Sequence, residues 1–201
     1  MKLNCRRFFI TIAVTCFLPL FFIAVAGAGN NKILGDLPGI FNTYETAMND
    51  LYTEYKKAGT KPEKEAIKQR RKALMEEYAL KVEASAASGG LVGKEIPFKV
   101  VGKVPFTVQK VKIASVTPDA VKFNVIVEIS QDLKDKNGEI KQREKIHFCA
   151  ADPKGAAIHK TWNWATSHDW IKLTKGTIYK ARGHWNANRV MNMHNFQYIK
   201  I

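Results

Sequence analysis

The chain has 201 residues, and its 32 lysines and arginines outnumber its 18 aspartates and glutamates, for a formal net charge of +14 with histidines neutral. Two of the three cysteines, Cys5 and Cys16, fall in the apolar N-terminal segment, so once that segment is removed Cys149 alone remains and cannot form an intramolecular disulfide. Stability must then come from packing, and a chain of this length can bury a substantial core.

The N-terminal residues predict an export signal. Lys2, Arg6 and Arg7 precede residues 8–28, which carry no charge and are rich in apolar residues, as in a signal peptide. The small residues of Ala24-Val25-Ala26-Gly27-Ala28 provide cleavage sites, and we predict a signal peptide over residues 1–26. The alternative is an uncleaved anchor, since the run is long enough to cross a bilayer. Both alternatives place the rest outside the inner membrane, so we expect a periplasmic or secreted protein, by either the general secretory or the twin-arginine route.

Residues 37–86 predict a helical hairpin. Gly59 ends the first helix, and the second begins at Thr60 or Lys61, with Pro62 and Glu63 in its first turn. Two helices of this length cannot bury both apolar stripes alone, so we expect the hairpin to pack on the following domain or on another copy. The stripes, at spacings of three and four, are Ile40, Phe41, Tyr44, Met48, Leu51 and Tyr55 in a helix over about residues 38–57, and Ile67, Leu74, Tyr78 and Val82 in the second.

From residue 93 onward the apolar period changes to two, which predicts strands. We expect a long first strand bent between Gly102 and Pro105, a second over residues 121–129, and a tight Asn137-Gly138 hairpin leading to a third that ends at residue 150. A helix over residues 161–173 follows, from the spacing of Trp162, Ala165, Asp169, Trp170 and Leu173, and then strands near residues 177–185 and 195–201. The expected fold is α+β and mainly β: a helical hairpin, then a five-stranded OB-fold, a Greek-key barrel, with a helix between strands three and four.

The glycines and alternating apolar residues of residues 93–201 resemble those of the tRNA anticodon-binding-like OB-fold family. The resemblance implies an OB-fold in an exported bacterial protein, and it does not by itself imply tRNA binding, because fold does not fix function. The segments that carry it are Gly93-Lys94-Glu95-Ile96, Val101-Gly102-Lys103-Val104 and Leu173-Thr174-Lys175-Gly176-Thr177-Ile178-Tyr179-Lys180-Ala181-Arg182-Gly183.

Nucleic acid is not the expected partner. Single-strand binders stack bases on aromatic side chains, worth about 1–3 kcal/mol per base, and the outward positions of strands two and three contain no aromatic residue. The positive charge suits anionic lipids and cell-wall polymers as well as phosphates. The outward positions are Lys122, Asn124, Ile126, Glu128, Lys145, His147 and Cys149.

The loop between the last two strands is the candidate binding site, because OB-folds often bind ligands there. Amides, an arginine and an indole suit a sugar or a peptide. The alternative is structural: Trp185 caps the core and the asparagines form turns. The candidate ligand-binding residues are Trp185, Asn186, Asn188, Arg189, Asn192 and His194, with Tyr179 and Arg182 from the neighbouring strand.

No metal site, cofactor or catalytic group is expected. The histidines all fall in the last third of the chain without close i,i+4 partners, and adjacent Ser167-His168-Asp169 cannot adopt triad geometry. We therefore expect a noncatalytic binding module of the cell envelope whose partner is an anionic envelope polymer, an oligosaccharide or a protein. The alternatives are a structural protein that oligomerises through its hairpin, and a single-stranded nucleic-acid binder.

Overall fold

The computed structural model describes residues 33–166 and 172–201, so the predicted signal segment lies outside the described residues. Within the described ranges, no helix combines the length and the apolar character that crossing a membrane requires. The elements are α1 (Leu37–Lys57), α2 (Lys61–Ser88), β1 (Phe98–Lys99), β2 (Phe106–Val116), β3 (Ala120–Ile129), β4 (Arg143–Ala151), β5 (Ala157–Thr166), β6 (Ile178–Asn186), α3 (Ala187–Val190) and β7 (Tyr198–Lys200).

The predicted helical hairpin is confirmed, because strong local signals fix both helix starts. Pro38 occupies the first turn of α1, where its missing N–H is not needed. At the start of α2 the Thr60 hydroxyl accepts from the Glu63 N–H at 3.4 Å, and the Glu63 carboxylate accepts from the Thr60 N–H at 3.0 Å. This capping box satisfies helix donors that would otherwise be unpaired. The hydrogen bonds from the Thr60 backbone and side chain and from the Gly59 backbone also lower the pKa of Glu63.

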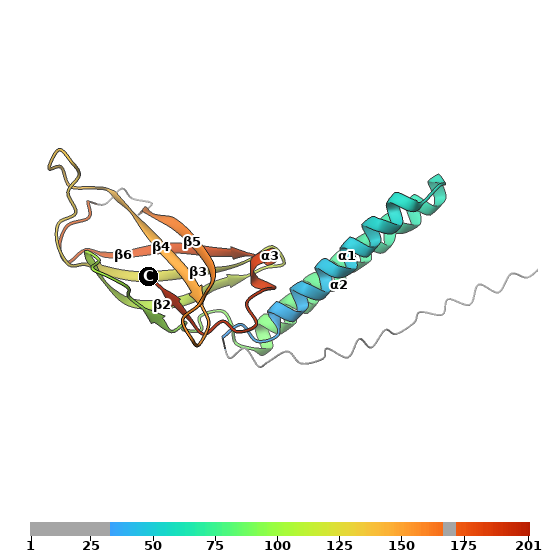
Figure 1. Ribbon diagram of the computed structural model, residues 1–201, viewed down its shortest axis with the longest axis horizontal. Helices are drawn as coiled ribbons and strands as arrows, with labels where there is room; N and C mark the ends of the chain where they lie inside the picture. The colour runs from blue at the N-terminus through green and yellow to red at the C-terminus, as the bar shows by residue number, and fades with distance from the viewer. Residues whose placement is uncertain (1–32, 167–171) are drawn as a thin grey trace, which may run out of the picture.

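Only the base of the hairpin packs on the β part of the molecule (Figure 1). Phe41 from α1 and Tyr78 and Val82 from α2 belong to the same buried cluster as the strand residues. Further along the hairpin, Leu51 and Ile67 are buried but lie outside that cluster. The far half of the hairpin therefore projects away from the strands.

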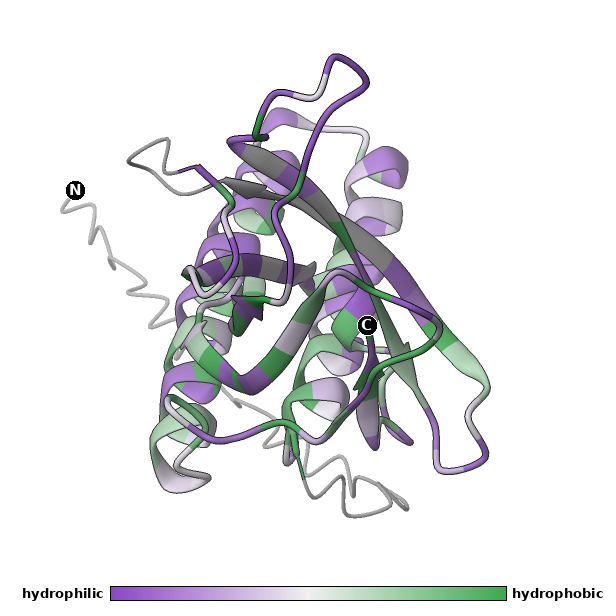
Figure 2. Ribbon diagram, turned by 90° about the vertical axis from the view of Figure 1, so that its left-hand side faces the viewer, coloured by the Kyte–Doolittle hydropathy of each residue, from purple (hydrophilic) through white to green (hydrophobic). Residues whose placement is uncertain are grey.

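The strands form two sheets packed face to face. Strands β2, β3 and β6 make an antiparallel sheet in that order, and the second sheet has the order β1-β7-β4-β5. Phe123 of β3 meets Phe148 of β4 edge to face, with 5.4 Å between ring centroids. Along the strands, hydrophobic and hydrophilic residues alternate, as expected for sheets with one buried face (Figure 2).

The α+β class is confirmed, but the described strands do not close into one barrel. The Asn137-Gly138 turn forms as predicted, with the Gly138 N–H donating to the Asp135 carbonyl at 3.1 Å. It does not join two paired strands: a single bridge links Lys134 and Ile140, and then β3 pairs with β2 and β6 while β4 pairs with β5 and β7. The prediction of the turn is confirmed, but a turn specifies strand pairing only for the residues next to it.

Two further sequence predictions need correction. Residues 161–166 belong to β5, paired in antiparallel register with β4 from Thr166↔Arg143 onward, and not to a helix; residues 167–171 lie outside the described residues. Threonine and tryptophan are common in this segment and favour strands, and this preference outweighed the helical spacing of the apolar residues.

The expected long first strand is two strands, β1 and β2, separated by Gly102 at a φ of 85°. Glycine adopts this value readily.

Candidate functional site

The residues predicted to bind ligand are divided between the core and the surface by the alternation of β6. Tyr179 and Trp185 point inward and are buried, whereas Arg182 lies on the exposed face. The Trp185 ring packs 4.4 Å from that of Phe123 and 5.2 Å from that of Phe196, measured between centroids. Trp185 is thus a core residue, as the structural interpretation of the sequence proposed, and burial raises the pKa of Tyr179.

The remaining predicted residues follow β6 and lie in two places. Asn186 and Asn188 line a cleft between α3 and the hairpin. Arg189 and Asn192 are exposed and His194 is half-buried, and none of these three lines that cleft. Arg189 is close enough to His159 of β5 to help lower the pKa of that imidazole, although burial is the larger cause.

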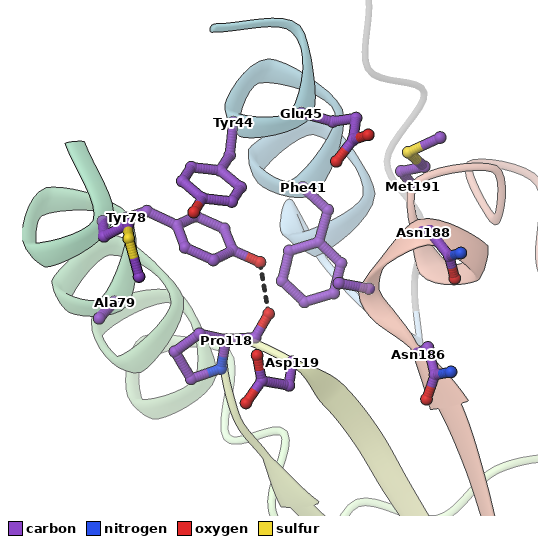
Figure 3. Close-up of a pocket in the computed structure, with 12 residues that line it drawn as sticks. Phe41, Tyr44, Glu45, Tyr78, Ala79, Pro118, Asp119, Asn186, Asn188 and Met191 are labelled. Carbon is purple, nitrogen blue, oxygen red and sulfur yellow. Dashed lines mark hydrogen bonds between the residues drawn. The ribbon is translucent and has the colours of Figure 1, made fainter. Parts of the chain in front are cut away.

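The cleft, which we call the junction cleft, lies where the hairpin meets the β part and has a volume of about 500 Å³ (Figure 3). Four segments far apart in the sequence contribute to it: α1, α2, the β2–β3 turn, and the end of β6 with α3. The lining residues are Phe41, Tyr44, Glu45, Met75, Tyr78, Ala79, Pro118, Asp119, Asn186, Ala187, Asn188 and Met191.

Two tyrosines form the aromatic wall of the junction cleft. The rings of Tyr44 and Tyr78 stack with 3.8 Å between centroids and 10° between planes. The Tyr78 hydroxyl donates to the Pro118 carbonyl at 2.6 Å, which ties α2 to the β2–β3 turn. Burial raises the pKa of both phenols, and the nearby Glu45 and Asp119 carboxylates add to the effect. Both tyrosines are therefore neutral at physiological pH.

The junction cleft is acidic although the chain is basic. Glu45 and Asp119 contribute carboxylates, and none of the lining residues is lysine, arginine or histidine. Neither carboxylate forms an ion pair within the described part of the chain. Figure 3 shows Glu45 near Met191 and Asn188, and Asp119 beside Pro118 at the other edge of the cleft. The cleft thus offers negative charge and amide groups next to an aromatic wall.

A second surface lies on the outward face of the β2-β3-β6 sheet. The strand register places Lys110, Ile126 and Lys180 in one row across it, and Lys112, Asn124 and Arg182 in the next. Lys122 and His184 are direct cross-strand neighbours in a third row. We call Lys110, Lys112, Lys122, Lys180, Arg182 and His184 the basic sheet face.

The basic sheet face is only partly neutralised. Glu95 lies 3.7 Å from the Lys110 amine and 3.6 Å from that of Lys112. Lys122 and Lys180 form no ion pair with another described residue. Like charges on neighbouring strands repel one another, so an anion bound here would relieve repulsion as well as gain attraction.

Sequence reasoning found parts of both surfaces. It selected Asn186, Asn188 and Arg182, but it assigned Tyr44 and Tyr78 only to the apolar stripes of the hairpin. The usable signal was chemical, because a tyrosine brings a hydroxyl that needs a partner where leucine would pack equally well. The alternation of Lys180, Arg182 and His184 was the corresponding signal for the basic sheet face.

The chain matches no known protein-family model, no curated protein and no solved structure. Within the described ranges, no three histidine, cysteine, aspartate or glutamate side chains are grouped so that they could hold a metal ion. The two surfaces present fixed charges, amide groups and aromatic rings.

Proposed function

We propose that this protein is a noncatalytic binding module of the cell envelope whose basic sheet face adheres to an anionic envelope polymer. The observation that carries the proposal is the cross-strand alignment of six basic side chains on one exposed sheet face. The export signal expected from the sequence supports the location, because such a protein meets cell-wall and lipid polyanions. The resemblance to the tRNA anticodon-binding-like OB-fold family remains a prediction for residues 93–201.

The geometry favours a repeating polyanion over a compact ligand. Neighbouring strands lie about 4.8 Å apart, and outward residues on one strand recur about every 6.8 Å, so the charges form an open array across the sheet and not a closed pocket. Each exposed ion pair contributes about 0.2–1 kcal/mol, which makes binding multivalent and sensitive to salt. The apolar residues on this face, Ile126 and Ile178, provide no aromatic ring on which a base could stack, which favours a polyanion other than nucleic acid.

Titration of the full chain with soluble polyphosphate at low and physiological salt tests this proposal. The triple variant Lys122→Gln, Lys180→Gln, Arg182→Gln removes three positive charges from the face. At about 0.5 kcal/mol for each lost contact, we expect the Kd to rise about tenfold.

The matched control is Lys57→Gln, Lys61→Gln, Lys136→Gln, which removes the same charge from exposed positions elsewhere. It should raise the Kd less than threefold, because only the long-range field changes. Equal losses in the two triple variants would show that adhesion depends on net charge and not on this face. Tighter binding of a single-stranded oligonucleotide than of polyphosphate, lost in the first variant alone, would indicate nucleic acid instead.

A second candidate function is structural, with the hairpin as an assembly element. On the hairpin, Tyr52, Met75 and Leu80 expose 51%, 52% and 67% of their surface. Tyr52 lies on α1 and the other two on α2, and exposed apolar surface that is contiguous is typical of surfaces that associate. This candidate predicts self-association of the chain, with the apolar residues of the hairpin at the contact.

A further inference from the structure

We infer that the junction cleft binds a cationic side chain, lysine or arginine, presented by a partner polypeptide. The inference concerns a site separate from the basic sheet face and of opposite charge. Four segments of the chain build it, and its two carboxylates form no ion pair with another described residue.

Charge complementarity identifies the occupant. In a chain with a formal net charge of +14, a cleft with two carboxylates and no basic lining residue repels the anions that suit the rest of the surface. Glu45 and Asp119 line the same cleft as the stacked tyrosines, and each raises the pKa of both phenols, so both carboxylates act on the same space. A cation placed there would be attracted by both.

The position of Arg71 indicates which end of the junction cleft a bound cation would occupy. Arg71 lies one helical turn before Met75, which lines the cleft from α2, and its guanidinium lowers the pKa of the Tyr44 phenol. A ligand cation would be repelled at that end of the aromatic wall. It would therefore lie toward Asp119 and Asn186, where Figure 3 shows the β2–β3 turn and the end of β6 approaching one another.

Size and chemistry favour a peptide side chain. About 500 Å³ is within the usual range for ligand sites, which is roughly 300–1,000 Å³, and it accommodates one long side chain and an apolar neighbour. The methylene groups of lysine or arginine can lie along Phe41, Tyr44 and Met75 while the charge stays near the carboxylates. The amides of Asn186 and Asn188 can donate to and accept from a peptide backbone.

The test uses the full chain and three fluorescent peptides with the sequence Ala-Leu-X-Leu-Ala, capped at both ends, in which X is lysine, glutamine or glutamate. We expect the lysine peptide to bind at least fivefold more tightly than the glutamine peptide, and the glutamate peptide most weakly. Glu45→Gln and Asp119→Asn should each weaken binding of the lysine peptide about three- to tenfold and leave the glutamine peptide unchanged. A loss of affinity that appears only when the peptide carries lysine shows that the two changes are coupled, which identifies a direct charge interaction between the carboxylate and the lysine.

Asp50→Asn is the matched control, since Asp50 is an exposed carboxylate on α1 that does not line the junction cleft. It should leave all three affinities unchanged. The amide side-chain NMR signals of Asn186 and Asn188 should shift with the lysine peptide. Equal affinity for the lysine and glutamine peptides, or equal effects of Asp50→Asn and Asp119→Asn, would overturn the inference. Binding of spermidine without binding of the lysine peptide would replace the polypeptide with a free amine.

Discussion

Phe123 lies directly over Gly183, its cross-strand partner on β6. A methyl group added to Gly183 would overlap the Phe123 ring, and this ring also packs on Phe148 and Trp185. The ring cannot move without disturbing the contact between the two sheets. The backbone of β6 therefore approaches this ring at a distance that only glycine permits.

We expect Gly183→Ala to lower the free energy of unfolding by about 1–3 kcal/mol, the usual cost of overpacking. Urea denaturation followed by tryptophan fluorescence measures it. Gly39→Ala is the matched control, because Gly39 lies in α1 with open space around it, and alanine there should stabilise by about 0.5–1 kcal/mol. A Gly183→Ala protein as stable as the wild type would show that the core is looser than the ring contacts indicate.

At the scale of elements, the start of α2 depends on a short-range signal. Replacing Thr60 with alanine removes the side-chain acceptor of the capping box, and we expect a loss of about 1 kcal/mol in the free energy of unfolding. Thr60→Ser should retain most of the stability because serine keeps the hydroxyl. Thr53→Ala on α1, which removes a hydroxyl bonded to the Asn49 carbonyl within the same helix, should be nearly neutral. Equal losses at Thr60 and Thr53 would contradict the assigned role of the cap.

The same signals explain which elements could be predicted. Pro38, Gly59, Thr60 and Pro62 act within one turn of the chain, and both helices begin within one residue of the expected position. Strand pairing is decided at long range: β3 lies beside β6, some 50 residues later, because the alternating faces of both strands fit the same core. Periodicity gives each strand a buried face but does not identify its neighbour.

At the scale of the whole molecule, prediction of the candidate site from the sequence is limited in the same way, because its residues come from distant segments. Asn186 and Asn188 could be selected from composition, but their partners in the junction cleft, Tyr44 and Tyr78, come from the hairpin more than 100 residues earlier. No local pattern connects them. Trp185 was the most prominent residue of the predicted loop, yet β6 alternation places it in the core.

Because the far half of the hairpin projects from the strands, its apolar residues are available for self-association of the full chain. If the hairpin is an assembly element, analytical ultracentrifugation of the full chain should show a concentration-dependent monomer–dimer equilibrium, because association buries apolar surface. The double variant Leu80→Glu, Tyr52→Glu should shift this equilibrium toward the monomer and raise the dimer Kd at least tenfold. Ile178→Glu, on an apolar side chain of the sheet that is equally exposed, is the control and should not. A single monomeric species at all concentrations would exclude the structural candidate.

The length of α2, which has 28 residues, also sets how far the hairpin extends from the β part. At about 1.5 Å per residue, the helix is about 42 Å long, and only its C-terminal end is attached to the β part. The 17 residues of α2 that precede Tyr78 span about 25 Å at that rise, so a partner that bound at the tip of the hairpin would be held about that far from the β part. Shortening both helices by two turns would change that spacing by about 11 Å and leave the binding surfaces intact, so the hairpin sets a distance.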